Sequence, residues 1–308
     1  MSRFVICSWA LALGSTLTPG CGPVILSADD TLAREGKNEV RLVAYLEQEP
    51  VLGLRRGVEN VRVRFYINGR EVGDDKTDRD GRAEDKCKLP GGTAQHFEAR
   101  ALQDGRDLRS RATIYSWRRD RTIIALDVDN TLAETEYKEL ILEDEDEESD
   151  PVKSSRKVLG RLAEEYQILY LTARPRFLLE KTREWLDEEH FPPGPVVTAK
   201  GIRQAASPGE FKRESLDNLR DGWPNLLIGI GDKASDAEAY GANKMLAVIV
   251  DKAPEAGIGH HSVVLRDWKS VGRFFESNHG VLSDPEELKE LIDDHGMLQV
   301  PLYPWRDE

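Results

Sequence analysis

The chain has 308 residues, of which 39% are hydrophobic, and this size and apolar content exclude fibrous and wholly disordered proteins. A formal net charge of −13 argues against general nucleic-acid binding through a basic face. Residues 31–118 carry 18 basic and 15 acidic side chains, whereas residues 119–308 carry 24 basic and 39 acidic ones. This contrast in charge predicts two structural units.

The first 21 residues have the pattern of an export signal. One arginine, Arg3, precedes an apolar stretch over residues 4–13, which is too short to cross a bilayer but has the length of a signal-peptide core. The segment 17–21 resembles a bacterial lipoprotein cleavage box, in which Cys21 is the acylated residue. The alternative is an ordinary signal peptide in which Cys21 has no role. We expect a signal peptide over residues 1–21 and therefore an exported protein of the cell envelope. The protein is expected to be either periplasmic or anchored to the membrane surface through Cys21. The alternative is a cytoplasmic protein.

A linker is expected over residues 22–37, followed by a β-sandwich over residues 38–118. In residues 61–67, apolar side chains alternate with polar ones, the period of two that buries one face of a strand. Asn68 and Gly69 follow and predict a tight hairpin turn. Further strands are expected over residues 39–45, 70–72, 97–101 and 112–117. This rhythm resembles a bacterial immunoglobulin-like domain, and it does not indicate which partner the unit binds.

From residue 119 onward, apolar strands alternate with helical patterns, which predicts an α/β domain over residues 119–308. Three apolar runs, each of which ends in a polar cluster, cover residues 122–126, 168–171 and 226–230. Helices are expected over residues 154–165, 177–189, 211–219, 235–240 and 285–295. Because the carboxyl ends of parallel strands meet at one edge of a sheet, the polar clusters are expected to form one site.

The polar clusters contain four aspartates suited to phosphoryl transfer. Asp127 and Asp129 follow the first run, so one carboxylate can face a phosphorus atom and the other its leaving oxygen. Carboxylates repel each other and the phosphate, so the site needs a divalent cation. Asp232 and Asp236 follow the third run and add hard oxygen ligands of the kind that Mg²⁺ prefers.

Phosphate-binding groups complete the predicted set. The hydroxyl of Thr172 and the ammonium of Lys212 are expected to bind the phosphoryl oxygens. Lys200 is the alternative to Lys212, which is preferred because it lies at the start of a predicted helix. Arg174 is expected either to touch a substrate phosphate or to pair with a nearby carboxylate.

These residues resemble the four motifs of the haloacid-dehalogenase-like phosphatase superfamily, which match residues 127–131, Thr172, Lys212 and residues 231–236. The resemblance implies a Rossmann-like, three-layer domain. It also implies that Asp127 is a nucleophile that forms an aspartyl-phosphate and that Asp129 is the general acid and base. The same resemblance assigns Mg²⁺ to the Asp127 side chain, the Asp129 backbone carbonyl and Asp232, with Asp236 bound directly or through water.

A narrower resemblance covers residues 121–252. The segments that carry it are residues 171–175, 185–186, 191–195 and 236–240, which resemble lipins, the Mg²⁺-dependent phosphatidate phosphatases, and the C-terminal domain of membrane-associated phosphatidylinositol-transfer proteins. It implies phosphatidate or another lipid phosphate as the substrate. Asn130 and Asp232 depart from the lipin pattern, which has Gly and Asn there. The alternatives are a phosphatidic-acid-binding module without turnover, and a protein or polynucleotide phosphatase, the last disfavoured by the acidic charge.

The spacing of the motifs bears on access to the site. The gaps over residues 132–171 and 173–211 are too short for the large cap domain that this superfamily inserts at these places. We therefore expect an open site that suits a bulky substrate. The acidic run over residues 143–150 lies in the first gap and is interpreted as a solvated loop, with a gate against polyanions as the alternative.

Overall fold

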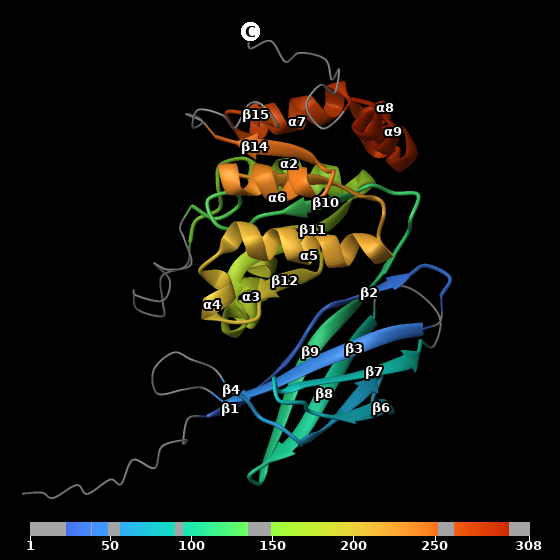
Figure 1. Ribbon diagram of the computed structural model, residues 1–308, viewed down its shortest axis with the longest axis vertical. Helices are drawn as coiled ribbons and strands as arrows, with labels where there is room; N and C mark the ends of the chain where they lie inside the picture. Colours follow the sequence, from blue (N-terminus) through green and yellow to red (C-terminus); the bar gives the residue numbers. More distant parts are fainter. Residues whose placement is uncertain are drawn as a thin grey trace, which may run out of the picture.

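The structure is a computed structural model that describes residues 23–37, 39–48, 56–89, 95–134, 149–251 and 262–295. It contains a β-sandwich at one end and a mixed α/β unit at the other (Figure 1). Strand β9 of the sandwich, Arg106–Trp117, leads directly into the first strand of the α/β unit.

The sandwich is formed by two sheets. The first sheet contains β1 (Val24–Ala28), β3 (Glu39–Gln48), β4 (Arg56–Gly57) and β7 (Arg82–Lys88), all paired antiparallel through β3. The second sheet has the order β2 (Thr31–Arg34), β9, β8 (Gln95–Gln103), β5 (Arg62–Ile67) and β6 (Arg70–Lys76), with β2 parallel to β9 and the other pairs antiparallel.

Alternation along the strands builds the sandwich core. Val63, Phe65 and Ile67 of β5 are buried, whereas their neighbours in the strand are exposed or half-buried. They pack in one cluster with inward residues of both sheets. Asn68 and Gly69 have φ angles of 51° and 75°, so the predicted hairpin turn between β5 and β6 is confirmed.

The expected linker over residues 22–37 is wrong for its described part. Residues 24–28 form β1, which pairs with β3, and residues 31–34 form β2, which pairs with β9. Between these strands the chain crosses from one sheet to the other at Asp29 and Asp30. A strand this short shows no clear periodicity by itself, and its pairing partners lie far along the chain.

The α/β unit is built around a six-stranded, fully parallel sheet. Its strands, in spatial order, are β12 (Val196–Ala199), β11 (Gln167–Pro175), β10 (Ile123–Leu126), β13 (Leu226–Gly231), β14 (Leu246–Val250) and β15 (Val263–Leu265). The helical elements are α2 (Ser155–Glu165), η1 (Arg176–Leu178), α3 (Leu179–Glu188), α4 (Ile202–Ala205), α5 (Pro208–Gly222), α6 (Ala234–Ala242), α7 (Trp268–Ser277), α8 (His279–Ser283) and α9 (Pro285–His295).

Helices cover both faces of this sheet, which gives three layers. Ile124 and Leu126 of β10 pack on one face with residues of α2, α3, α7, α8 and α9. Ile123 and Ala125 pack on the other face with residues of α4, α5 and α6. Because β10 is buried on both sides, its sequence is a continuous apolar run, as predicted.

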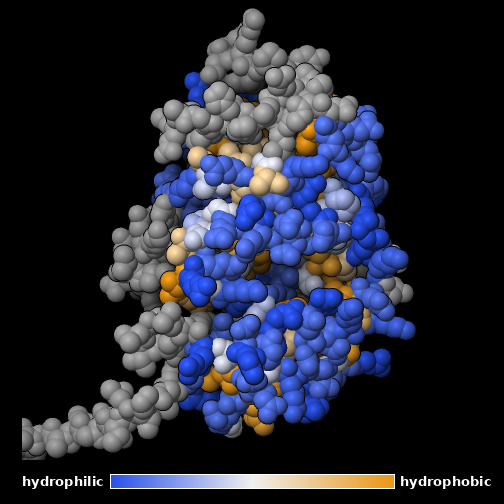
Figure 2. All heavy atoms as spheres, in the orientation of Figure 1, coloured by the Kyte–Doolittle hydropathy of each residue, from blue (hydrophilic) through white to orange (hydrophobic). Residues whose placement is uncertain are grey.

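In the described parts of the two gaps between motifs, the chain forms only elements of these layers. Helix α2 lies in the first gap, and η1, α3, β12 and α4 lie in the second. The surface of the described residues is largely hydrophilic on the face seen in Figure 2, and the large hydrophobic side chains exposed among them are Leu102 and Ile202. The described helices include none with the length and apolarity that a membrane span requires.

Candidate active site

Polar side chains from three neighbouring strands meet at the carboxyl edge of the parallel sheet. Asp127 and Asp129 follow β10, Thr172 and Arg174 lie near the end of β11, and Asp232 follows β13. All three strands run parallel, so their carboxyl ends share one edge. The structure therefore brings the three predicted clusters together.

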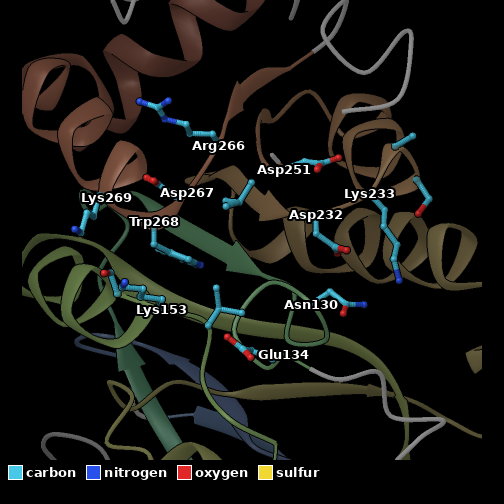
Figure 3. A pocket seen from close by; sticks show the side chains of 15 residues that line it. Asn130, Glu134, Lys153, Asp232, Lys233, Asp251, Arg266, Asp267, Trp268 and Lys269 are labelled. Atoms are coloured by element: carbon cyan, nitrogen blue, oxygen red, sulfur yellow. The ribbon is translucent and has the colours of Figure 1, made fainter. Parts of the chain in front are cut away.

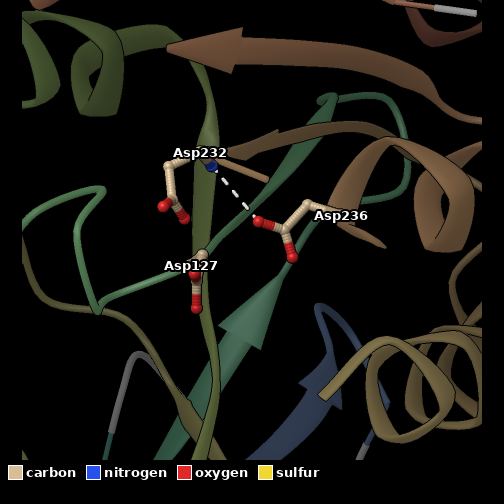
Figure 4. Close-up of side chains that lie close together, drawn as sticks. All are labelled: Asp127, Asp232 and Asp236. Carbon is tan, nitrogen blue, oxygen red and sulfur yellow. Dashed lines mark hydrogen bonds between the residues drawn. The ribbon is translucent and has the colours of Figure 1, made fainter. Parts of the chain in front are cut away.

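Three carboxylates form the centre of this site (Figure 4). Asp127, Asp232 and Asp236 each place an oxygen within 4.8 Å of the other two. The backbone N–H groups of Asp232 and Lys233 donate to Oδ2 of Asp236, each at 3.2 Å, and orient that carboxylate. Three hard oxygen donors at this separation form a donor set that could hold a divalent cation.

The close approach of Asp236 to β13 depends on a glycine. Gly231 is the last residue of β13, and a Cβ added there would lie 2.4 Å from Oδ2 of Asp236. That distance is far inside van der Waals contact, so a larger residue would displace the carboxylate. The Gly-Asp pair at 231–232 therefore has a packing reason in addition to a chemical one.

Lys212 is buried against two of the three carboxylates. Its Nζ lies 2.9 Å from Oδ1 of Asp127 and 2.5 Å from Oδ1 of Asp236. Burial by itself would lower the pKa of Lys212, but the two carboxylates raise that pKa above its ordinary value, so the ammonium stays charged. Lys200, the alternative, instead lines a cleft between the two units that Tyr45 of the sandwich also lines.

Asp129 makes a separate set of contacts. Its Oδ2 accepts a hydrogen bond from the Thr172 hydroxyl at 3.2 Å, and its Oδ1 accepts two from Arg174, from Nε at 3.0 Å and from Nη2 at 2.9 Å. Nη1 of Arg174 donates to the Thr182 hydroxyl at 3.2 Å. Of the two roles expected for Arg174, the structure thus shows the pairing with a carboxylate. Both predicted phosphate-binding groups of β11 hold Asp129.

The buried charges of the site do not cancel. The four predicted carboxylates face two buried cations, the Lys212 ammonium and the Arg174 guanidinium, and the charge of Lys233 also acts on Asp232. Burial, reinforced by the neighbouring carboxylates, raises the pKa of Asp127 to about 8 and that of Asp232 to about 6. A divalent cation would stabilise the ionised form of these clustered carboxylates, so the residues fit the predicted Mg²⁺.

A cleft of about 1090 Å³ opens beside the carboxylates (Figure 3). Asn130 and Asp232 line one end of it, and Lys153, Arg266 and Lys269 line the other. Of the four predicted aspartates, Asp232 is the one that lines this cleft.

Sequence reasoning missed the cleft residues that follow the last two strands. Asp251 follows β14 and Arg266 follows β15, at the same edge of the sheet as the other polar clusters. The apolar run over residues 246–250 is of the same kind as the three runs that predict buried strands, and it could have pointed to Asp251. Trp268 at the start of α7 donates from Nε1 to the Thr131 carbonyl at 2.8 Å and holds the segment after β10 in place.

Several predictions fall outside the described residues. These are the signal peptide over residues 1–21, acylation of Cys21, and the acidic run as far as residue 148. They remain predictions.

A family model and a curated protein are similar in sequence to parts of this chain. The family model for the LNS2 domain of the PITM 1-3 proteins matches residues 124–247. Among curated proteins, phosphatidate phosphatase PAH1 of Arabidopsis thaliana is 28% identical over 187 residues, which cover 52% of this chain. The match covers 20% of that relative, so the chain spans about a fifth of its length.

Two solved structures show more distant likeness. The core domain of a proposed phosphoglycolate phosphatase from Streptococcus pneumoniae TIGR4 is 17% identical, with a TM-score of 0.31, and covers 51% of this chain and 96% of its own. The M1 domain from titin is 16% identical, with a TM-score of 0.22, and covers 31% of this chain and 95% of its own. Residues 124–247 are thus similar in sequence to the LNS2 domain, and about half of the chain is similar to a phosphatidate phosphatase.

Proposed function

We propose that the α/β unit is a Mg²⁺-dependent phosphomonoester hydrolase of the haloacid-dehalogenase type that acts on a lipid phosphate, with phosphatidate as the first candidate. The observation that carries this proposal is the placement of Asp127. It is buried, lies 2.9 Å from one ammonium, and shares a cluster with two further carboxylates. The sequence similarity to a phosphatidate phosphatase supports the substrate class.

Each residue of the site has a role in the proposed reaction. An oxygen of Asp127 attacks phosphorus and forms the P–O bond of an aspartyl-phosphate while the bond to the ester oxygen breaks. Asp129 must first take up a proton from solvent; it gives that proton to the departing oxygen and then, again a carboxylate, takes one from the water that releases phosphate. Lys212 offers its ammonium to the phosphoryl oxygens, and Arg174 holds the Asp129 carboxylate in place. The Thr172 hydroxyl donates its one proton to Asp129 and would have to turn from that carboxylate to bind a phosphoryl oxygen.

A divalent cation would be held by Asp127 and Asp232, with Asp236 bound directly or through water. When bound, the ion neutralises charge on the phosphoryl group. Both oxygens of Asp236 already accept hydrogen bonds, Oδ1 from Lys212 and Oδ2 from two backbone N–H groups. This arrangement favours the indirect contact for Asp236. Acylation of Cys21, which remains a prediction, would bring such an enzyme to its lipid.

The test measures phosphate release from 4-nitrophenyl phosphate and from phosphatidate in vesicles, with Mg²⁺ and with a chelator. We expect Mg²⁺-dependent release from both, and a loss of at least about 1,000-fold in Asp127→Asn. Asp217→Asn is the matched control, because Asp217 is an exposed carboxylate on α5 and should leave the rate unchanged. Activity that survives Asp127→Asn contradicts the role of Asp127 as nucleophile. Vesicle binding without release by the wild type favours a binding module.

A further inference from the structure

The β-sandwich contacts the α/β unit immediately after strand β11. Arg176 begins η1, and its side chain is only 5% exposed. The guanidinium forms an ion pair with Asp29 and lies 3.6 Å above the ring of Tyr45 on β3. A buried arginine that is both ion-paired and stacked has little freedom, so this contact fixes the start of η1.

A second contact of the same joint lies next to the first. Asp30 is 4% exposed and accepts hydrogen bonds from Arg183 on α3. The Asp30 carboxylate also accepts hydrogen bonds from the backbone N–H groups of Thr113 in the sandwich and Val196 in the α/β unit. Asp29 and Asp30 both lie where the chain crosses between the two sheets of the sandwich. The joint is therefore built from mostly buried polar groups, and of these Nε of Arg176 has no hydrogen-bond partner among the described residues.

The sheet itself does not fix the segment that precedes Arg176. Strand β11 pairs with β12 at Thr172 and again at Pro175, with a register shift between them. On its other side, β11 pairs with β10 only as far as Tyr170. Arg174 lies within the shifted stretch, so ladder hydrogen bonds do not set its position. Pairing with β12 resumes at Pro175, and Arg176, which contacts the sandwich, follows directly.

Arg174 is one of the two β11 residues that hold Asp129; the other is Thr172. Two N–H groups of its guanidinium donate to Oδ1 of Asp129, and the side chain is buried. Displacement of the backbone between Thr172 and Arg176 would move this guanidinium and loosen the carboxylate. The path from the sandwich to the site is thus short and consists of named contacts.

We propose that Asp29 and Arg176 are positioning residues for Asp129, so that the docked β-sandwich sets the geometry of proton transfer in the α/β unit. This inference rests on the proposed function, in which Asp129 protonates the leaving oxygen. The sandwich is then a fixed part of the active-site framework, since it holds the segment whose arginine orients that carboxylate.

The consequence is a dependence on the leaving group. Phenol is a much weaker acid than 4-nitrophenol, so phenyl phosphate needs protonation of its leaving oxygen far more than 4-nitrophenyl phosphate does. Poor placement of Asp129 should therefore slow the first ester much more than the second. A loss of folded protein would lower both rates by the same factor.

The experiment compares kcat/KM for the two esters in Asp29→Asn. We expect a loss of about tenfold with phenyl phosphate and less than about threefold with 4-nitrophenyl phosphate. Arg176→Lys keeps the positive charge, provides a second test if the first variant does not fold, and should show the same inequality. The control is Trp223→Leu, which removes a joint contact to Trp117, 5.9 Å between ring centroids, at the far end of α5. It should lower the melting temperature and affect both esters equally. Equal losses in Asp29→Asn, or unequal losses in Trp223→Leu, would overturn the proposal.

A structural measurement separates this inference from the proposed function. In a crystal structure of Asp29→Asn, we expect the Arg174 guanidinium to have left Oδ1 of Asp129, with both N···O distances beyond hydrogen-bond range. Contacts that stay at 2.9–3.0 Å overturn the positioning role whatever the kinetics. If the wild type hydrolyses neither ester, the proposed function fails, and this structure alone decides the inference.

Discussion

Replacing the proposed nucleophile should make the metal-free protein more stable at alkaline pH. Burial and neighbouring carboxylates raise the pKa of Asp127 from 3.8 to about 8 in the folded protein. A carboxyl whose folded pKa lies above its unfolded value binds a proton more tightly when folded. Its stabilising contribution is therefore complete below the unfolded pKa and is lost as the pH rises through the folded pKa. Asp127→Asn removes this loss, because the amide does not ionise.

The size of the effect follows from linkage. The slope can reach about 1.4 kcal/mol per pH unit for one group, so the interval from pH 5 to pH 8 corresponds to at most about 4 kcal/mol. Lys212 remains paired with Asp236 in the variant, at 2.5 Å, so the substitution does not leave a buried ammonium alone. We expect Asp127→Asn to exceed the wild type by about 2 kcal/mol more at pH 8 than at pH 5.

The assay is urea unfolding in a chelator at both pH values, repeated with Mg²⁺. Asp217→Asn is again the control and should stay within about 0.5 kcal/mol of the wild type under all conditions. Mg²⁺ should stabilise the wild type at pH 8 and should have a much smaller effect on Asp127→Asn, because a ligand that binds only the folded state stabilises it. If the difference between variant and wild type does not change with pH, the raised pKa of Asp127 is wrong.

Two further substitutions test the packing of the site. Lys212→Met should lower the free energy of unfolding of the metal-free protein at pH 8 by about 3 kcal/mol, because it leaves two buried carboxylates without their cation. The control, Lys244→Met, removes an exposed ion pair and should lower that free energy by less than about 1 kcal/mol in the same urea titration. Gly231→Ala should displace Asp236 and weaken Mg²⁺ binding by at least about tenfold, as measured by calorimetry. The control is Gly160→Ala, because Gly160 lies in α2 with open space around it. This variant should bind Mg²⁺ normally, and its free energy of unfolding should rise by up to about 1 kcal/mol. Normal Mg²⁺ affinity in Gly231→Ala, or equal costs for the two lysine variants, would contradict the proposed packing.

Local patterns were sufficient to locate most of the candidate site. These strands of the parallel sheet are buried on both faces, so each can be recognised in the sequence as a continuous apolar run. The polar residues that follow each run must then lie at the carboxyl edge of the sheet. That rule predicted where Asp127, Asp129, Thr172 and Asp232 lie. It needs only the strand direction and no knowledge of which strands are neighbours.

Pairing between distant segments could not be predicted in the same way. Strands β1 and β2 were expected to be linker, because their strand character comes from β3 and β9. Sequence patterns alone did not decide whether Arg174 contacts a phosphate or a carboxylate. They also left Lys200 and Lys212 as alternatives for binding the phosphoryl group. Arg174 and Lys212 are held by carboxylates that lie 45 and 24 positions away along the chain.

The sequence by itself determined the class of the α/β unit and the residue types at its carboxyl edge, since hydrophobic periodicity acts over a few neighbouring residues. Only the tertiary structure decided how those residues divide. Asp127 and Asp129 are two positions apart, yet one lies with Lys212 and Asp236 and the other with Arg174. That division depends on which oppositely charged group is buried beside each carboxylate, because burial without a partner is too costly to persist.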